Sequence, residues 1–407
     1  MTRSIKLVTE LELDSVSPKP LNVKNLMIAV PGTYSPEKKS EIVRIKQFCR
    51  ILSVLPSKQR PRKITIFGND GQKYEFLLKG NEDLRQDELV MQLFTMVNRL
   101  LAANPETCQQ ELFVRTYSVT PFSDSCGMVS WVDRHDTLHA LIKMYRQCKR
   151  ADLGAERNLI AKVGVVRRAD AQYAPMYEEM MPVRRVDVFN TLMNETIGDD
   201  LKSVLWLRSK SSEKWLLRRT NYTRSLAVMS MVGYILGLGD RHPSNIMINR
   251  ATGSICHIDF GDCFEVTMVR EKFPERVPFR LTRMLVKAME VGGVEGTFRS
   301  TCENVMSVIR QNEDSLMAIL EAFVHDPLMN WKLTEKTPEN GASEQEGSEM
   351  IKLEANTKAT TVISRVRDKL TGNDFYQDEK ISVQEQVRRL ITQATSRYNL
   401  CQSYLGW

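Results

Sequence analysis

The chain has 407 residues, of which 42% are hydrophobic and 26% charged, and its formal net charge is +7. This length allows two or three domains of ordinary globular composition. The positive excess suits an anionic ligand, but it lacks the clustered basic face of a nucleic-acid-binding protein, so no nucleic-acid partner is expected.

Eight cysteines are scattered singly, without a CxxC pair or a Cys/His cluster at zinc-ligand spacing. They predict reduced thiols and a cytoplasmic protein, with the nucleus and the surface of endomembranes as alternative locations. No segment resembles a signal peptide, and the most apolar helix candidate, residues 226–238, is too short to span a bilayer. Membrane contact is expected to be peripheral at most, through the apolar tail at 404–407.

The first third of the chain predicts a small mixed domain over residues 1–130. Strands at 63–67 and 74–78 are joined by the turn Asn69-Asp70-Gly71 and form a hairpin. Apolar residues at helical spacing between 89 and 101 predict a helix. Strand-like runs follow at 112–119 and 127–132.

A larger, mainly helical domain is predicted over residues 131–333. Residues 225–238 are apolar nearly all round, which indicates a helix buried at the centre of the domain. Two short β-runs follow at 246–248 and 255–258, and helices resume from 281 to 331. A small mixed domain before a larger helical one is the order found in bilobal kinases.

The C-terminal part predicts a linker and two helices. Residues 334–347 are almost all polar and are expected to be disordered. Residues 348–374 should form a helix that ends before Gly372, a favourable C-terminal cap. A second helix, within 375–407, should begin with the capping box Ser382-Val-Gln-Glu385.

Two motifs predict the chemistry: Gly237-Leu-Gly-Asp-Arg-His-Pro-Ser-Asn245 and His257-Ile-Asp-Phe-Gly261. Phosphoryl transfer needs a carboxylate that orients the attacking hydroxyl and oxygen ligands that hold Mg²⁺ on the phosphates. We assign Asp240 as the catalytic base, and Asn245 and Asp259 as the metal ligands. His242 could donate to developing charge or share the role of base. One such triplet alone could merely cap a turn, but two motifs flanked by β-runs favour an active site.

A cation and a phosphate-covering loop should complete the site. Lys79 closes the strand Phe76-Leu-Leu-Lys79, where it can reach the phosphates of ATP, and carboxylates at 82, 83, 87 and 88 could pair with it. No GxGxxG or Walker motif precedes it. The segment Ser57-Lys-Gln-Arg-Pro61 lies between two strand-like runs, where it is either a plain polar turn or the loop over the phosphates.

The inverted order Asp-Arg-His at 240–242 resembles the phosphoinositide-3-kinase-related protein kinases. Four further stretches resemble the target-of-rapamycin group within that family, and the tail at 399–407 is similar to its C-terminal FATC element. The four stretches are Phe76–Asp87, Arg219–Met231, Gly261–Glu265 and Pro278–Met284.

This resemblance implies an α+β, bilobal kinase fold of the phosphoinositide-3/4-kinase type that uses ATP and Mg²⁺, with Mn²⁺ as an alternative ion. It also implies that Asp87 pairs with Lys79, that Ser57 and Gln59 contact the phosphates, and that Val132 supplies backbone hydrogen bonds to adenine. The implied adenine pocket consists of Leu77, Tyr117, Val129, Trp131, Val132, Met247 and Ile258.

The family further implies a serine/threonine protein kinase that regulates growth and responds to nutrients. Its expected partners are protein substrates, scaffold subunits and a WD-repeat propeller that docks on an insertion. Here the corresponding segment, about 149–185, is longer and aligns poorly. The FATC-like segment 375–407 also lacks the Cys-Pro-aromatic ending of the family and is expected to be truncated.

Two alternatives are a phosphoinositide lipid kinase and a pseudokinase scaffold. Between Asp262 and Phe279 three basic residues stand against four acidic ones, a net charge of −1 that favours a peptide over a polyanionic headgroup. A pseudokinase usually loses its metal ligands or its base, whereas Lys79, Asp240, Asn245 and Asp259 are all present. The sequence therefore favours an active protein kinase.

Overall fold

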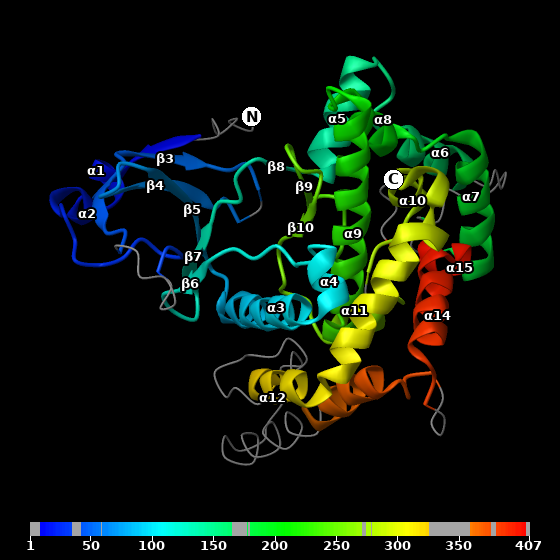
Figure 1. The fold of residues 1–407 in the computed structure, drawn as a ribbon. Coiled ribbons are helices and arrows are strands. Elements are labelled where there is room, and N and C mark those ends of the chain that lie inside the picture. Colours follow the sequence, from blue (N-terminus) through cyan, green and yellow to red (C-terminus); the bar gives the residue numbers. More distant parts are fainter. Residues whose placement is uncertain are drawn as a thin grey trace, which may run out of the picture. The chain divides into compact units, whose positions relative to one another are not determined.

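The computed structural model describes residues 9–34, 42–57, 59–164, 177, 180–270, 274–277, 279–324, 359–375 and 380–403. The predicted linker at 334–347 and the apolar tail at 404–407 lie outside these residues. The chain divides into two compact units (Figure 1). Unit 1 comprises Met1–Gln92 and Thr116–Asp133, and unit 2 comprises Leu93–Arg115 and Arg134–Trp407.

Unit 1 is built on a seven-stranded antiparallel sheet. Its strand order is β1-β3-β4-β5-β7-β6, and β2 also pairs with β4. The strands are β1 (Glu10–Glu12), β2 (Ile45–Phe48), β3 (Ile51–Val54), β4 (Arg62–Gly68), β5 (Lys73–Gly80), β6 (Val119–Pro121) and β7 (Cys126–Ser130). Two short helices, α1 (Leu13–Val16) and α2 (Lys19–Asn22), follow β1.

Strand alternation gives the sheet of unit 1 two different faces. Successive side chains of a strand point to opposite faces, so i and i+2 lie together. One face carries the buried core of this unit, which includes Ile64, Ile66, Phe76 and Met128. The odd-numbered residues of β5 and β7, among them Leu77 opposite Val129, lie on the other face. Side chains alternate along each strand, so the predicted nucleotide-binding residues Leu77, Lys79 and Val129 lie on the face opposite the core.

The predicted elements of unit 1 are largely confirmed. The hairpin is β4 and β5, and its turn contains Gly71 at φ +79°, a conformation that favours glycine. The predicted helix is α3 (Arg85–Ala103), which begins in unit 1 and continues into unit 2. The strand predicted at 112–119 is wrong over most of its length, because residues 112–118 are irregular and β6 begins only at Val119. Within that run the backbone of Val114 bonds the side chain of Asn98 instead of a neighbouring strand. The Asn98 amide donates to the Val114 carbonyl and accepts the Val114 N–H.

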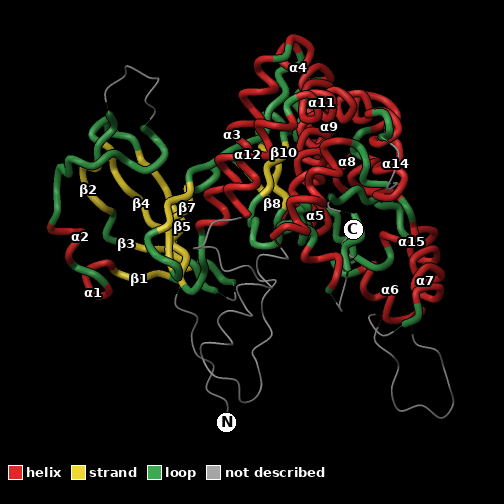
Figure 2. Tube along the Cα trace, turned by 90° about the horizontal axis from the view of Figure 1, so that it is seen from below, coloured by secondary structure: helices red, strands yellow, loops and turns green. Residues whose placement is uncertain are grey.

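Unit 2 is mainly helical around one long central helix, as the secondary-structure colouring of Figure 2 shows. Its described helices are α4 (Pro105–Gln109), α5 (Leu138–Cys148), α6 (Ala155–Gly164), α7 (Pro182–Glu195), α8 (Asp200–Leu207), α9 (Ser212–Leu236), α10 (Arg283–Lys287), α11 (Arg299–Gln311), α12 (Glu313–Val324), α14 (Val383–Thr395) and α15 (Arg397–Leu400). Residues 359–371 are also helical. A small antiparallel sheet of order β10-β9-β8 is formed by β8 (His135–Thr137), β9 (Ile246–Asn249) and β10 (Ile255–His257).

The central helix α9 leads directly into the first motif. Its C-terminal half is buried on all sides, as predicted, and it ends at Gly237 in a left-handed conformation. The helix begins at Ser212, well before the predicted start at 225, because its first half is exposed on one side and so lacks the all-round apolar pattern. Ser211 caps this end by accepting the backbone N–H of Lys214.

Of the C-terminal helices, α14 packs on α11 and α15 on α7 (Figure 1). Lys369 and Gln386 form a buried polar network with Tyr234 of α9. The predicted ends of the C-terminal helices are confirmed: Gly372 has φ +87°, and Ser382 accepts the N–H of Glu385. Lys369, only 1% exposed, donates to the carbonyl of Tyr234 and lies 2.5 Å from the carboxylate of Glu265. Burial favours neutral Glu265, but Lys369 and Arg365 outweigh it and lower the pKa of this carboxyl. The pair links the C-terminal helices to the segment after the second motif.

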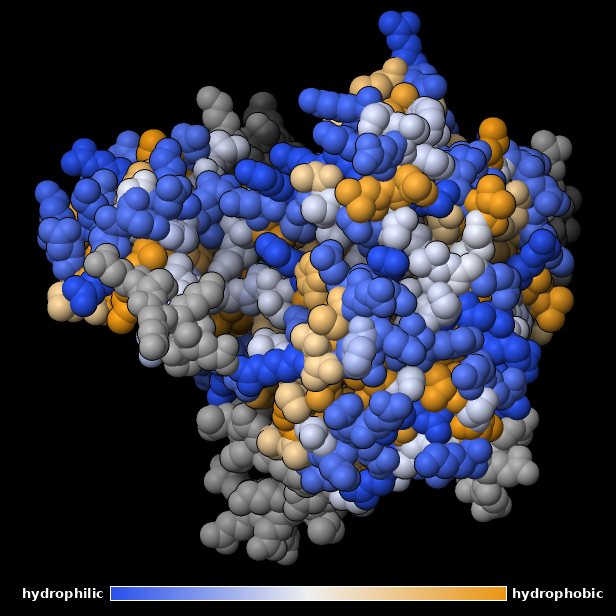
Figure 3. Space-filling view, viewed as in Figure 1, coloured by the Kyte–Doolittle hydropathy of each residue, from blue (hydrophilic) through white to orange (hydrophobic). Residues whose placement is uncertain are grey.

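The face drawn in Figure 3 is mostly hydrophilic, and its hydrophobic side chains lie in small groups. Among the described residues, no helix combines the length and the apolarity needed to cross a bilayer.

We expect Glu265→Gln to destabilise the protein by about 3–5 kcal/mol at pH 7, because it leaves the Lys369 ammonium buried without its counter-charge. The double variant Glu265→Gln/Lys369→Met should recover most of this loss. A matched control is Glu321→Gln, whose ion pair with Arg367 is exposed and should contribute less than about 1 kcal/mol. Thermal and denaturant unfolding measure the differences.

The same pair predicts a dependence on pH. Because the folded state lowers the pKa of Glu265, its stabilisation is present above the ordinary carboxyl value of 4.5 and is lost as the pH falls below it. The gap between wild type and Glu265→Gln should therefore shrink in acid. A gap that is constant from pH 7 to pH 4 would contradict this assignment.

Candidate active site

The first motif forms the loop between α9 and β9, and it positions Asp240 beside Asn245. Asp240 is in the left-handed conformation, with φ +58°. The side-chain amide of Asn245 donates to the backbone carbonyl of Asp240 at 3.1 Å and to its carboxylate at 3.3 Å. The two residues therefore lie in contact, although an unusual backbone angle is needed to bring them together. Asp tolerates this region better than most residues.

Arg241 joins the first motif to the second. Its guanidinium is buried, with the side chain 2% exposed, and it donates to three backbone carbonyls. These belong to Gly239 (2.7 Å), Ile258 (3.0 Å) and Asp259. A planar guanidinium carries five N–H donors in a fixed fork, so one side chain can hold two loops in a set geometry. Arg241 therefore joins the two motifs, together with the backbone bond from the Ile258 N–H to the carbonyl of Asn245.

Asp259 lies just after β10 and has a left-handed backbone, with φ +64°. The residue that follows it, Phe260, holds this part of the backbone in place. The Phe260 ring is buried, packs edge-on against Phe94 at 5.3 Å and lies under the Arg241 guanidinium at 5.6 Å. Within the described part of the chain, the Asp259 carboxylate forms no hydrogen bond or ion pair. Its backbone is thus fixed, while its charge is available to a ligand.

The oxygen atoms of Asp259 and Asn245 fit a magnesium ion that arrives with a nucleotide. Among the described residues no cluster of three or more His, Cys, Asp or Glu side chains could hold a metal ion. Mg²⁺ in phosphotransferases is usually held by one or two carboxylates, with phosphates and waters completing the octahedron. One carboxylate and one amide oxygen satisfy that requirement, whereas they would not make a site for a resident ion.

His242 is arranged as a hydrogen-bond donor. Its Nδ1 accepts the backbone N–H of Ser244 at 3.1 Å, so in the neutral ring the proton is on Nε2. Burial, followed by the charges of Arg241 and Arg280, lowers the pKa of His242 in spite of the carboxylates of Asp240 and Asp259. Its Nε2 lies 3.8 Å from the Asp240 carboxylate. Of the two predicted roles, this geometry favours donation to developing charge over the role of base.

In unit 1, Lys79 lies on the non-core face of the sheet, on the same face as Leu77 and Val129. Its ammonium forms a salt bridge with Glu82 at 3.2 Å. Asp87 is buried in the first turn of α3, and its pairing with Lys79 stays a prediction.

The predicted phosphate loop is an exposed turn between β3 and β4. Ser57 and Gln59 are both exposed there, and the carbonyl of Ser57 accepts the N–H of Arg60 at 3.1 Å. A contact between these two residues and a phosphate stays a prediction.

The predicted adenine-pocket residues are divided between the units. Leu77, Tyr117, Val129, Trp131 and Val132 belong to unit 1, and all five are partly buried. The Trp131 N–H bonds the carbonyl of Glu75 at 2.8 Å, extending the sheet beyond β7.

Met247 and Ile258 belong to unit 2, where they flank the motifs. Met247 pairs with Cys256 across β9 and β10, and the N–H of Ile258 donates to the carbonyl of Asn245 at 3.0 Å. Both side chains are partly buried.

The acidic residues after the second motif do not form one surface facing a substrate, as the sequence predicts. That prediction is wrong for the three acidic residues that the structure describes. Asp262 pairs with Arg270 at 2.6 Å, Glu265 pairs with Lys369, and Glu275 accepts the backbone N–H of Asp240 at 2.6 Å. Glu271 and Lys272 lie outside the described residues. The local charge therefore does not distinguish a peptide substrate from a lipid.

Two residues of the site are not predicted by the motifs. Arg241 stands within Asp-Arg-His, so its position offered a signal, although the sequence does not show what its guanidinium contacts. Glu275 lies 35 residues beyond Asp240 and offers no signal. Burial and the neighbouring Asp240 charge raise the pKa of Glu275.

Comparison with known proteins identifies the family. Residues 73–333 match the model of the family described as phosphatidylinositol 3- and 4-kinase. The chain belongs to this family. Residues 380–407 match the FATC domain. The bilobal kinase-type fold class predicted from the sequence is thereby confirmed.

The chain is similar to target-of-rapamycin kinases over its whole length. It is 48% identical to the serine/threonine-protein kinase mTor of Drosophila melanogaster, covering 100% of this chain and 18% of that one. It is 50% identical to the serine/threonine-protein kinase TOR2 of Saccharomyces cerevisiae, covering 98% and 17%. A solved structure, the FAT and kinase domain of CtTel1, has a TM-score of 0.73 and 32% identity, covering 93% and 24%. The chain thus spans less than a fifth of the two curated relatives.

We expect Arg241→Lys to reduce phosphoryl transfer from ATP by about 100-fold or more, because an ammonium cannot reproduce the fork that binds three carbonyls. Arg250→Lys is the matched control, since Arg250 is 60% exposed and pairs only with Asp136 among the described residues. Turnover per folded protein is the measurement, with circular dichroism as the check on folding. Equal turnover of the two variants would contradict the role given to Arg241.

Proposed function

We propose that this chain is the catalytic region of a serine/threonine protein kinase that transfers the γ-phosphate of ATP to protein hydroxyls. One observation carries the proposal: a single buried guanidinium, that of Arg241, binds the backbones of both motifs. The geometry thus fixes Asp240 and Asn245 relative to Asp259. Phosphoryl transfer is catalysed mainly by positioning and electrostatics, which is what such a rigid constellation supplies.

Each residue has a proposed task. Asp240 orients the attacking hydroxyl and accepts its proton, while the Nε2–H of His242 donates to charge that develops on the phosphoryl oxygens. Asn245 and Asp259 hold Mg²⁺, with Mn²⁺ as an alternative; the ion neutralises phosphate charge when bound. Lys79 contacts the α- and β-phosphates, and Asp87 supports it.

The remaining nucleotide contacts are proposed from the family resemblance. Ser57 and Gln59 cover the phosphates. The adenine ring meets the backbone of Val132 and a set of partly buried side chains, namely Leu77, Tyr117, Val129, Trp131, Met247 and Ile258.

The names of the relatives support a protein substrate rather than a lipid. The family described as phosphatidylinositol 3- and 4-kinase includes lipid kinases, so a phosphoinositide kinase is the second candidate. The target-of-rapamycin relatives, however, are named serine/threonine-protein kinases and match this chain at 48–50% identity. The pseudokinase alternative has little support, because every residue expected to bind metal or accept a proton is present.

The cellular role follows the same relatives. We propose a regulator of growth and nutrient signalling that works in the cytoplasm with scaffold subunits. A WD-repeat propeller is the proposed partner of the segment 149–185, of which the structure describes α6 and the start of α7.

We expect Asp259→Ala to abolish Mg²⁺-dependent ATP binding, and Asp240→Asn to keep that binding while losing about 10²–10⁴-fold in turnover. The first variant removes a metal ligand, whereas the second keeps the shape but cannot accept a proton. Isothermal titration of Mg-ATP and steady-state peptide phosphorylation separate the two. Unchanged Mg-ATP affinity in Asp259→Ala, or normal turnover in Asp240→Asn, would remove that residue from its role.

The protein should phosphorylate Ser/Thr peptides in preference to phosphoinositides. Both substrates are offered with radiolabelled ATP, and the activity of Asp240→Asn, purified identically, is subtracted as the background from other kinases. A wild-type preference for lipid would overturn the protein-kinase assignment.

A further inference from the structure

The backbone of Asp240 is held by a side chain from outside both motifs. The Asp240 N–H donates to Oε2 of Glu275 at 2.6 Å, a charge-assisted distance. A non-glycine residue in the left-handed region costs roughly 1 kcal/mol or more and persists only where its surroundings impose it. On one side of Asp240 that constraint is Asn245, and on the other it is Glu275.

Glu275 is itself fixed against the loop that carries Asp240. Its N–H donates to the carbonyl of Thr267 at 3.1 Å, and Thr267 is buried, 2% exposed. The Thr267 side chain packs so closely on Gly239 that a Cβ there would lie 2.1 Å from its Oγ1. The N–H of Gly239 in turn bonds the carbonyl of Asp262 at 2.9 Å. Asp262, Thr267 and Glu275 therefore lie directly against the first motif, where the Glu275 side chain bonds the backbone of Asp240 and Arg270 lies 3.9 Å from the Asp240 carboxylate.

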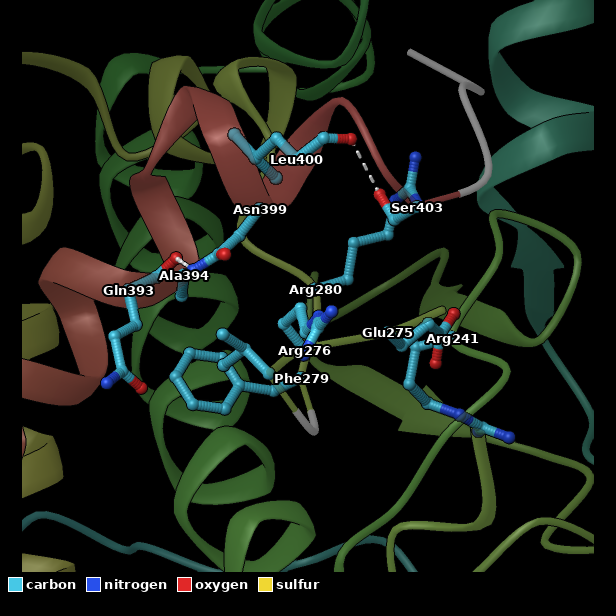
Figure 4. A pocket seen from close by; sticks show the side chains of 11 residues that line it. Arg241, Glu275, Arg276, Phe279, Arg280, Gln393, Ala394, Asn399, Leu400 and Ser403 are labelled. Atoms are coloured by element: carbon cyan, nitrogen blue, oxygen red, sulfur yellow. Dashed lines mark hydrogen bonds between the residues drawn. The ribbon is translucent and has the colours of Figure 1, made fainter. Parts of the chain in front are cut away.

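The other side of Glu275 opens on a small pocket of about 30 Å³, which lies between Glu275 with the residues that follow it and the C-terminal helices (Figure 4). Gln393 and Ala394 of α14 and Asn399 and Leu400 of α15 line one side of it. A carboxylate next to such a space could turn towards solvent and be hydrated there. Instead it points to the Asp240 N–H, although burial raises its pKa. Because burial of the Glu275 carboxylate costs energy, its bond to the Asp240 N–H points to a role in the candidate site.

We propose that Glu275 is a positioning residue for phosphoryl transfer: by accepting the Asp240 N–H, it sets the direction of the Asp240 carboxylate. This inference rests on the proposed kinase function. Glu275 reaches no phosphate in this role, since it acts through the backbone of Asp240. It makes the geometry of the proposed base depend on a residue beyond the second motif and not only on the motif that contains Asp240.

Three variants test the proposal by steady-state phosphorylation of a Ser/Thr peptide. Glu275→Ala removes the acceptor and should lower kcat by roughly 10- to 100-fold. Its KM for ATP should stay within about twofold, because the proposed metal and phosphate ligands are untouched. Glu275→Gln keeps an acceptor oxygen at the same position and should retain kcat within about threefold. Glu295→Ala is the matched control, since Glu295 is 69% exposed and pairs with Arg299 in the following turn; it should behave as wild type.

The outcomes separate this inference from the function on which it rests. Wild-type transfer with an unchanged kcat in Glu275→Ala would overturn the positioning role alone. Equal losses in the Gln and Ala variants would overturn it too, because the effect would then come from the charge and not from the accepted hydrogen bond. A loss confined to the KM for ATP, or one explained by a lower unfolding temperature of both variants, would indicate a structural role. Absence of transfer by the wild type to any peptide would overturn the proposed function and this inference together.

Discussion

The candidate site depends on one buried cation. Arg241 donates to carbonyls of Gly239, Ile258 and Asp259, and its guanidinium covers the ring of Phe260. A buried guanidinium is costly unless its donors are satisfied, so the two loops must adopt the conformation that satisfies them. The left-handed angles of Asp240 and Asp259 are compatible with that arrangement. One guanidinium thus ties together the backbones at two acidic residues, Asp240 and Asp259, that the chain separates by 19 residues.

Around this centre, further polar contacts connect the site to the periphery of unit 2. Glu275 accepts the backbone N–H of Asp240. The Glu265 N–H donates to the carbonyl of Gly237, and the Glu265 carboxylate pairs with Lys369 of the C-terminal helices. These acids resemble a substrate-facing surface in the sequence, yet each has an internal task. The C-terminal region is therefore part of the support of the candidate site, and not an appendage to it.

The sheet of unit 1 follows a simpler rule. Its alternation puts Phe76 and Met128 in the core and leaves Leu77, Lys79 and Val129 on the opposite face. No long-range contact is needed for this sorting, because the period of a strand imposes it. The period of the strand thus explains why these residues share a face, whereas their nucleotide-binding role is implied only by the family resemblance.

The amino-acid sequence by itself determined the elements with strong local signals, and it predicted the residues of the candidate site. The hairpin, the buried half of α9, the cap at Gly372 and the cap at Ser382 each follow from period, turn chemistry or hydrogen bonds within a few residues. The spacing of Asp240, Asn245 and Asp259 likewise indicated phosphoryl transfer. Only the tertiary structure decided which way His242 is protonated, what Arg241 contacts and where Glu275 points. Those outcomes depend on groups that are distant in the chain and on burial, which local pattern does not encode.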